Sequence, residues 1–158
     1  MPVGLRKTSE PLTTDVIRMF LRDTVEQNSL TDDIEFAKKD IDNAMFLAVA
    51  KWNAIPPISN VTDPAHLNAY VLLCGVCGLL LKSEGLRQNR NQLTVQDGNI
   101  APVGIDDKED QYYKWARHFQ DEFNTFASRI KIQENMESLI SACSGLSSGY
   151  AYLGRFTY

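Results

Sequence analysis

The spacing of apolar residues along the chain predicts helices separated by short polar stretches. We expect the first helix to be capped by Thr13 or Thr14 and to end at the polar run 27–29. Its apolar residues fall on one helical face: Val16, Ile17, Phe20, Leu21 and Val25.

A second helix is expected to begin near Asp32, with the Asp32 and Glu35 side chains forming a capping box. The helix must end before Pro56-Pro57, because the first proline disfavours helical backbone at Ile55. The longest apolar stripe of the chain lies between these limits: Ile34, Ala37, Ile41, Ala44, Met45, Ala48, Val49 and Trp52.

Asp63-Pro64 predicts the start of a third helix, with Asp63 as its cap and proline in the first helical position. From Leu67 to Leu81 this helix is apolar almost all round, which indicates a central position in the fold. Gly75 and Gly78 would let another helix approach closely. A strand over 75–78 is the alternative, but the length of the apolar run favours a helix.

Asp97-Gly98, between the apolar stretches 93–95 and 100–105, predicts a tight β-hairpin turn. Pro102 cannot donate a backbone hydrogen bond, so the second strand would be an edge strand or only partly paired. Asp106 and Asp107 then cap a fourth, long helix. Its aromatic and apolar residues recur in steps of four and three, which is coiled-coil-like spacing: Tyr112, Ala116, Phe119, Phe123, Phe126 and Ile130.

The last segment, 139–158, differs from the rest because it combines glycines, serines and tyrosines with a single charge, Arg155. It is too apolar for an ordinary disordered tail and too rich in glycine for a good helix. We therefore expect it to be extended and to dock on its own domain or on a neighbour. The predicted fold is mainly α: a bundle of about four helices with a short β-hairpin before the last long helix and an extended C-terminal tail. The predicted parts are an N-terminal arm (1–11), a helical domain (12–138) and a docking tail (139–158).

The net charge of −4 and the pI near 5.1 disfavour a protein that coats nucleic acid, since such binding depends on Lys and Arg. The apolar run 70–81 is shorter than the roughly 20 residues that cross a bilayer, so we interpret it as a buried helix. The N-terminus has no apolar signal-like run, which predicts folding in a cytoplasm with reduced thiols.

Candidate chemistry is sparse, and we expect a protein that is not an enzyme and that has no catalytic residues, metal or cofactor. Cys74 and Cys77 form a Cys-x-x-Cys pair, but they lie inside the apolar run, where core packing is the favoured interpretation. His66 and His118 have helical neighbours only. The acidic cluster Asp106, Asp107, Glu109 and Asp110 is typical of a helix N-terminus, and the basic residues Lys82, Arg87 and Arg90 are typical of a solvated helix end.

In order along the chain, several landmarks resemble the head–tail connector (adaptor, or neck) proteins of tailed bacteriophages. The resemblance covers most of the chain from Asp32 onward and rests on short, degenerate motifs. These are Trp52-Asn53-Ala54-Ile55-Pro56-Pro57, Asp63-Pro64 opening an apolar helix to Arg90-Asn91, Val95-Gln96-Asp97-Gly98, Ile105-Asp106-Asp107-Lys108, Lys131 to Asn135, and a C-terminal Gly-Ser-Tyr segment.

The resemblance implies a structural virion protein, located in the neck and made in the host cytoplasm, whose copies form a homo-oligomeric ring, commonly of twelve. It implies a portal protein and a tail or second neck protein as partners, and packaged DNA that passes through the channel without specific binding; no membrane is involved. The element Ser147-Ser148-Gly149-Tyr150 matches the small-Ser-Tyr part of the family's portal-binding tail, with Tyr152, Leu153, Arg155 and Phe156 beside it. The chain departs from the family by extending several residues past Tyr150. One alternative is a DNA-packaging or DNA-binding accessory protein in which Lys82, Arg87, Arg90 and the hairpin contact phosphates. The other is a thiol enzyme or metal-binding domain that uses Cys74 and Cys77.

Overall fold

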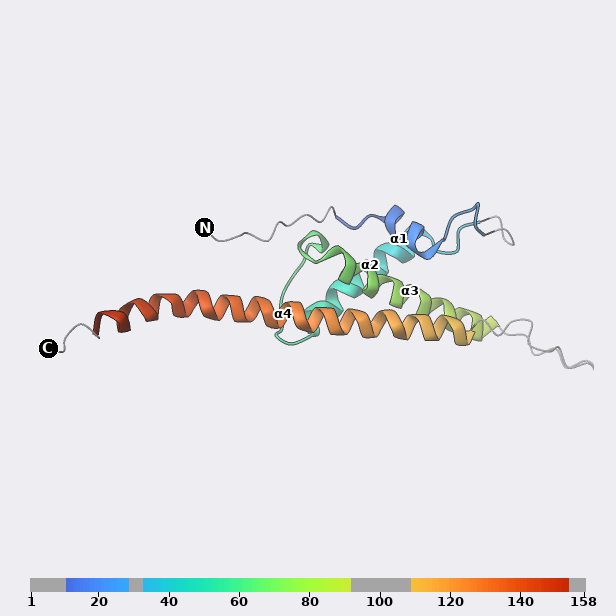
Figure 1. The fold of residues 1–158 in the computed structure, drawn as a ribbon. Coiled ribbons are helices and arrows are strands. Elements are labelled where there is room, and N and C mark those ends of the chain that lie inside the picture. Colours follow the sequence, from blue (N-terminus) through green and yellow to red (C-terminus); the bar gives the residue numbers. More distant parts are fainter. Residues whose placement is uncertain (1–10, 29–32, 92–108, 154–158) are drawn as a thin grey trace, which may run out of the picture.

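The computed structural model describes residues 11–28, 33–91 and 109–153. Over these ranges the chain is mainly helical, as expected, with four α-helices and one 3₁₀ turn (Figure 1). The bounds are α1 Thr14–Leu21, α2 Lys38–Ala54, η1 Pro64–His66, α3 Ala69–Asn91 and α4 Glu109–Leu153. The expected β-hairpin, the Asp106 and Asp107 caps and nearly all of the N-terminal arm lie outside the described residues.

Helix α1 begins as predicted, because the Thr13 side chain accepts a hydrogen bond from the Val16 backbone N–H at 3.4 Å. It ends earlier than predicted, at Arg22, which adopts a left-handed conformation with φ of 59°. Val25 therefore lies beyond the helix and is 51% exposed, so its assignment to the apolar face was wrong. The polar run at 27–29 is preceded by a turn that the apolar pattern did not reveal.

The buried carboxylate of Asp23 organises the connection between α1 and α2. It accepts hydrogen bonds from the backbone N–H groups of Glu35, at 2.5 Å, and Phe36, at 3.1 Å. Arg18 donates to the same carboxylate at 3.0 Å and to the Phe36 carbonyl at 2.7 Å. Because the Glu35 and Phe36 amides bind Asp23, this stretch is not helical, and the predicted start of the second helix near Asp32 was too early.

Helix α2 starts at Lys38, with Ala37 at its cap position and no capping side chain. It ends at Ala54, before Pro56-Pro57, as predicted. The Asn53 side chain then holds the following loop, since it donates to the Val61 carbonyl at 2.8 Å and accepts from the Val61 N–H at 2.9 Å. This loop returns the chain to the start of α3.

The predicted Asp63 cap is present, because its carboxylate accepts from the Ala65 N–H at 2.9 Å. It opens the 3₁₀ turn η1, and a second cap follows: the Asn68 side chain accepts from the N–H groups of Tyr70, at 3.0 Å, and Val71, at 3.3 Å. The main helix α3 therefore starts one cap later than the Asp63-Pro64 signal suggested.

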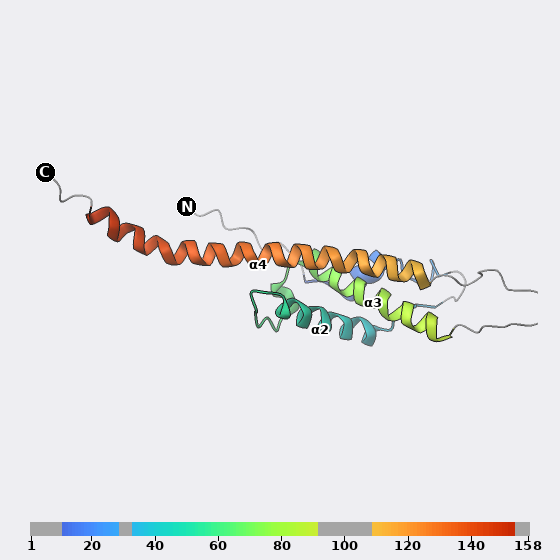
Figure 2. The ribbon, with the colours of Figure 1, turned by 90° about the horizontal axis from the view of Figure 1, so that it is seen from below.

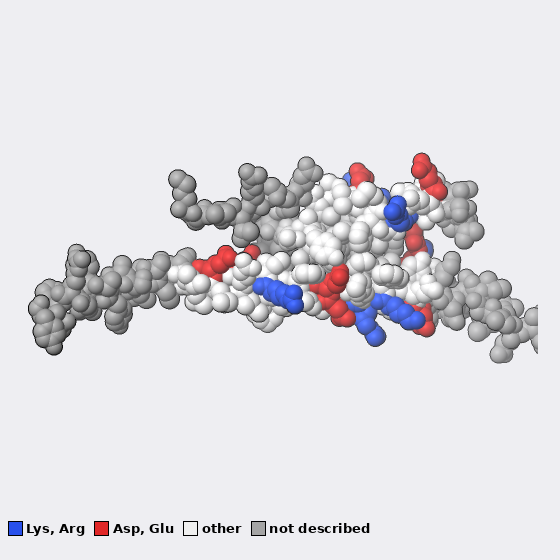
Figure 3. Space-filling model, viewed as in Figure 1, with Lys and Arg blue, Asp and Glu red and all other residues white. Residues whose placement is uncertain are grey.

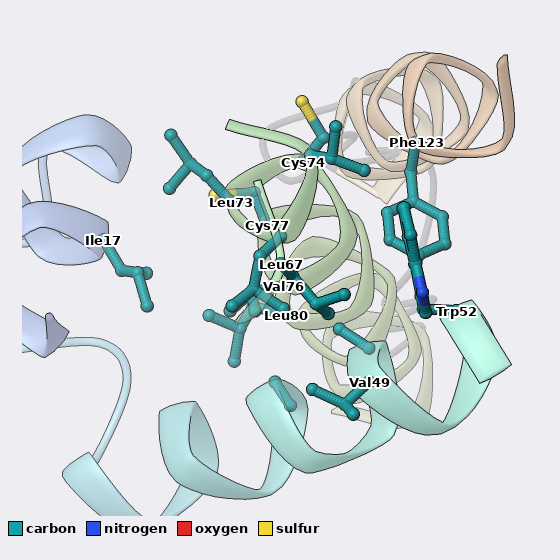
Figure 4. Close-up of a cluster of buried hydrophobic side chains, with 14 of the residues drawn as sticks. Ile17, Val49, Trp52, Leu67, Leu73, Cys74, Val76, Cys77, Leu80 and Phe123 are labelled. Atoms are coloured by element: carbon teal, nitrogen blue, oxygen red, sulfur yellow. The ribbon is translucent and has the colours of Figure 1, made fainter. Parts of the chain in front are cut away.

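Helix α3 is the centre of the bundle, as predicted, and it packs against α1, α2 and α4. Residues 71–78 are all buried, while Tyr70 is half exposed. Figure 4 shows Ile17 of α1, Val49 and Trp52 of α2 and Phe123 of α4 directed toward this helix. Phe123 has no exposed surface. The same figure labels the α3 side chains and the preceding Leu67 that complete the cluster: Leu73, Cys74, Val76, Cys77 and Leu80.

By length and hydropathy alone, Ala69–Arg90 could cross a bilayer, with a mean hydropathy of 1.5 over its most apolar window. The apolar helix is thus longer than the run considered in the sequence. However, 61% of that window is buried inside the bundle, as in the core helix of a soluble protein. The α3 side chains that make this helix apolar contact other helices of the same chain.

Helices α3 and α4 lie side by side over the first half of α4, and the small residues of α3 permit this approach (Figures 1 and 2). A Cβ atom at Gly75 would lie 2.8 Å from two ring carbons of Phe123, and one at Gly78 would lie 2.9 Å from Cγ of Gln120. The prediction that these glycines serve close helix packing is confirmed. The aromatic seam of α4 also contacts its own chain, since Phe119 meets Phe20 and Phe126 meets Tyr70 edge to face.

Candidate functional site

The tail predicted to dock on a partner is helical in the described residues. Helix α4 continues to Leu153, so 139–153 has helical backbone where its glycines predicted an extended chain. Ser147, Ser148, Gly149, Tyr150, Tyr152 and Leu153 thus lie along the last turns of α4, whereas Arg155 and Phe156 lie outside the described residues.

The second part of α4, residues 132–153, projects away from the bundle in both ribbon views (Figures 1 and 2). We call this part the overhang. Residues 132–140 are all exposed, and their large apolar side chains fall on one helical face. This overhang stripe consists of Ile132, Met136, Leu139 and Ile140, which are 54–66% exposed. An unpaired stripe of this kind is typical of a helix that contacts another molecule.

Lys131 fixes the point at which the overhang leaves the bundle. Its ammonium donates to the carbonyls of Trp52, at 2.5 Å, Ile55, at 2.6 Å, and Pro57, at 3.0 Å. It also lies 5.3 Å from the centre of the Trp52 ring. A cation is favourable here because the last carbonyls of a helix lack intrahelical partners and carry partial negative charge. No local pattern in the sequence indicates this contact, since Lys131 is an ordinary polar position within a predicted helix.

A second apolar surface lies on α2 and on the loop that follows it. It is an open groove of about 480 Å³. We call it the α2 groove, and its apolar lining includes Met45, Phe46, Val49, Val61 and Pro64. Phe46 is 72% exposed. The sequence pattern missed this groove because it assigned only the inward stripe of α2, and a separate loop supplies the opposite wall.

The basic residues at the end of α3 do not form an open cationic patch. Arg87 contacts the buried carboxylate of Glu84 through two nitrogens, each at 2.8 Å, and lies 4.0 Å from Glu35. Tyr112 donates to Glu35 at 3.1 Å. Burial and the nearby Glu84 carboxylate raise the pKa of Glu35. Lys82 and Arg90 are exposed, and the face shown in Figure 3 carries scattered charges of both signs.

The thiols of Cys74 and Cys77 are buried and unbonded, as predicted for core residues. Burial raises the pKa of Cys77 to about 12 and that of Cys74 to about 11, so both are protonated at neutral pH. Cys74 lies 3.6 Å from the Glu122 carboxylate, which also accepts from Tyr70 at 3.1 Å. This packing does not give an accessible thiolate.

The remaining candidate residues are not brought together either. His66 and His118 are exposed and lie beside Asp63, at 4.0 Å, and Glu122, at 3.7 Å, respectively. Of the predicted acidic cluster, Glu109 begins α4 and Asp110 is exposed in its first turn. Among the residues that the structure describes, no group of three His, Cys, Asp or Glu is placed to hold a metal ion.

Comparisons with known proteins give no further guide. No family model matches the chain, and neither a curated protein nor a solved structure matches it.

Proposed function

We propose that the chain is a structural virion protein, a ring-forming head–tail connector subunit that docks on the portal of a tailed bacteriophage. The bundle holds copies of the chain in the ring, and the end of α4 reaches the portal. In this role the ring links the DNA-filled head to the tail.

The observation that carries the proposal is the overhang with its stripe. A bundle whose core is already filled has no internal use for a projecting helix with four exposed apolar side chains. Such a helix face is a common form of recognition element, because residues at i, i+4, i+7 and i+8 can enter one groove of a partner. The order of motifs along the chain resembles that of connector proteins. We therefore infer that the partner of this helix is the portal.

The residues proposed to contact the portal are those of the tail: Ser147, Ser148, Gly149, Tyr150, Tyr152, Leu153, Arg155 and Phe156. Tyrosines suit an interface because each offers a large apolar ring and one hydroxyl. Helical backbone at the first six of these residues changes the expected mode of docking. We therefore propose that the tail docks as a helix in a groove of the portal, and not as the extended strand that its glycines predicted.

The test is co-purification with the portal protein of the same virus. Truncation after Ser138 is expected to leave the melting temperature almost unchanged, because 132–140 contacts no buried core, and to abolish portal binding. Tyr150→Ser together with Tyr152→Ser in the full chain should weaken portal binding by roughly 30-fold or more. Trp115→Ser is the matched control, since Trp115 is an exposed aromatic residue, 58% exposed, on the bundle.

Two results would refute the proposal. One is full portal binding by the truncated chain, and the other is unfolding of the truncated chain, which would make the tail part of its own core. The DNA-binding alternative receives no support from Arg87, which is paired with Glu84. Salt-dependent retention of the purified protein on DNA would favour that alternative.

A further inference from the structure

The α2 groove combines an apolar lining with acidic charge. Phe46, which is 72% exposed, forms part of the apolar lining, and Asp42 is the one charged residue that lines the groove. Among the described residues, no cation is paired with Asp42. Asp63 adds a second exposed carboxylate next to Pro64, at the edge of the groove. Charge complementarity therefore favours an occupant that is both apolar and basic.

The basic residues near the groove do not supply its counter-charge. Lys38 and Lys39 lie in the first turn of α2. The ammonium of Lys51 lies 5.1 Å from the centre of the Phe123 ring, on the side of α2 that packs in the bundle. None of these lysines lines the groove, and neither does His66. The acidic charge of the groove is thus left for its occupant.

The N-terminal arm has the required chemistry in its sequence. Residues 1–10 contain one Arg and one Lys, at positions 6 and 7, and one acidic residue, at position 10. The apolar side chains precede this basic pair at alternate positions, so an extended chain would carry them on one side: Met1, Val3 and Leu5.

The other segments outside the described residues do not fit the groove. Segment 29–32 contains one Asp and no basic residue, and segment 92–108 contains three Asp and one Lys. Segment 154–158 follows the overhang, which leads away from the bundle (Figures 1 and 2). The overhang itself has only acidic charges at 132–140, namely Glu134 and Glu137. The N-terminal arm is therefore the segment that matches the groove in charge and in place.

The arm joins the bundle near the groove. Leu12 packs on the same hydrophobic core as Met45 and Val61, which line the groove. In both ribbon views the chain that leads into α1 lies close to η1, whose first residue, Pro64, also lines the groove (Figures 1 and 2). Ten extended residues span up to about 33 Å, whereas the 17 residues of α2 are about 26 Å long. The arm can therefore reach the whole groove of its own chain.

We propose that residues 1–10 dock in the α2 groove of the same chain. The apolar residues of the arm cover Phe46, and its basic pair faces the carboxylates of Asp42 and Asp63. The tether at Pro11 keeps the arm at an effective concentration of about millimolar, which favours the chain's own arm over that of a second copy. The docked arm covers an apolar surface that would otherwise promote association. This contact goes beyond portal docking and does not involve the overhang stripe.

The rate at which a thiol in the arm reacts measures its docking in the full chain. Val3→Cys in a Cys143→Ser background provides the thiol, while Cys74 and Cys77 are buried. With an effective concentration of roughly 5 mM and a Kd of about 1 mM for the untethered arm, the thiol is accessible about one-sixth of the time. Its labelling in the native chain should thus be about 5-fold slower than in urea-unfolded chain.

A matched pair of substitutions on α2 tests the apolar part of the contact. Phe46→Ser removes the exposed ring from the groove and should restore fast labelling of the thiol. Leu47→Ser is the control, because Leu47 is 52% exposed at the next position of α2 and does not line the groove. It should leave the slow labelling unchanged. Circular dichroism checks that both variants keep the helical content of the unaltered chain.

Exchange of the charges tests the polar part of the contact. Asp42→Lys should speed labelling about 3-fold or more, and so should Arg6→Glu together with Lys7→Glu. Combining all three substitutions should slow labelling again, because opposite charges then face each other once more. Disruption of the fold by Asp42→Lys would not be reversed by changes in the arm.

Three results would overturn the inference. The first is labelling of the native chain as fast as that of unfolded chain, and the second is slow labelling that Phe46→Ser does not relieve. The third is slow labelling that is lost on dilution, since protection by a second copy depends on concentration and protection within one chain does not. No portal protein is present in these measurements, so their outcome is independent of portal docking.

Discussion

The contact between Gly75 and Phe123 gives the sharpest stability prediction. An alanine Cβ at position 75 would lie 2.8 Å from Cδ2 and Cε2 of the Phe123 ring and 3.2 Å from Cβ of Ala48. Carbon atoms pack best about 3.5 to 4.0 Å apart, so the ring would have to move by roughly 0.7 Å. Phe123 has no exposed surface and is held by the core on its other sides. Gly75→Ala therefore overfills the core.

Two opposing effects set the magnitude. Overpacking of this kind costs about 1 to 3 kcal/mol. Replacing glycine by alanine inside a helix returns about 1 kcal/mol through lower backbone entropy in the unfolded chain. Because the new Cβ would contact two ring carbons at once, we expect an overpacking cost in the upper part of this range. The free energy of unfolding should then fall by about 1 to 2 kcal/mol in net terms.

Gly85→Ala is the matched comparison on the same helix. Its Cβ would meet its nearest neighbours, Tyr112 and Tyr113, at 3.4 to 3.5 Å, which is ordinary contact. No steric cost then opposes the stabilisation that alanine gives over glycine inside a helix. This variant should therefore be more stable than the unaltered chain by up to about 1 kcal/mol. The two glycine-to-alanine changes are thus expected to have opposite signs.

Urea unfolding followed by far-ultraviolet circular dichroism measures both variants. Adding Phe123→Leu to Gly75→Ala should recover about 1 kcal/mol relative to the sum of the single changes, since the smaller side chain vacates the contact. If Gly75→Ala equals or exceeds the stability of Gly85→Ala, α3 and α4 do not approach as closely as described.

Three further predictions concern buried polar and thiol groups. Lys131→Met should lower the free energy of unfolding by about 2 to 4 kcal/mol, measured by urea unfolding, because three carbonyls at the end of α2 lose a charged donor; a loss below about 0.5 kcal/mol would show that water replaces it fully. In a Cys143→Ser background, Cys74 and Cys77 should react with a thiol reagent only after unfolding, because burial keeps both thiols protonated, and fast native labelling would contradict their place in the core. The raised pKa of Glu35 means that the folded state holds its proton more tightly than the unfolded state, so its contribution to stability falls as the pH rises from the ordinary value of 4.5 through the folded pKa. Glu35→Gln should remove that part of the pH dependence and keep the Tyr112 contact; an unchanged profile of melting temperature against pH would exclude this role.

The local signals in the sequence predicted the helices well wherever one residue decides the outcome. The side chains of Thr13 and Asp63 accept hydrogen bonds from backbone N–H groups two or three residues later, and Pro56 disfavours helical backbone at the residue before it. The start of α1 and the end of α2 therefore lie where these residues predict. The all-round apolar run correctly identified α3 as the central helix, because a helix without a polar face needs neighbours on every side.

The errors arose where distant groups competed with local preferences. The carboxylate of Asp23 captures the Glu35 and Phe36 amides, and this contact across the chain delays α2. Glycines at 145 and 149 predicted an end to the last helix, but their cost of about 1 kcal/mol each is spread over a long helix that is already nucleated by its packing on α3. No local pattern predicted Lys131, since its three acceptors lie more than seventy residues earlier in the chain.

The place of Lys131 also has a mechanical consequence. The overhang behaves as a lever of roughly 33 Å, at 1.5 Å per residue, with its pivot at Lys131. A tilt of about 5° at the pivot moves the tip of α4 by roughly 3 Å. The Lys131 ammonium is hydrogen-bonded to the end of α2. A force on the C-terminal end of α4 therefore also acts on α2 and on the wall of the groove that α2 forms.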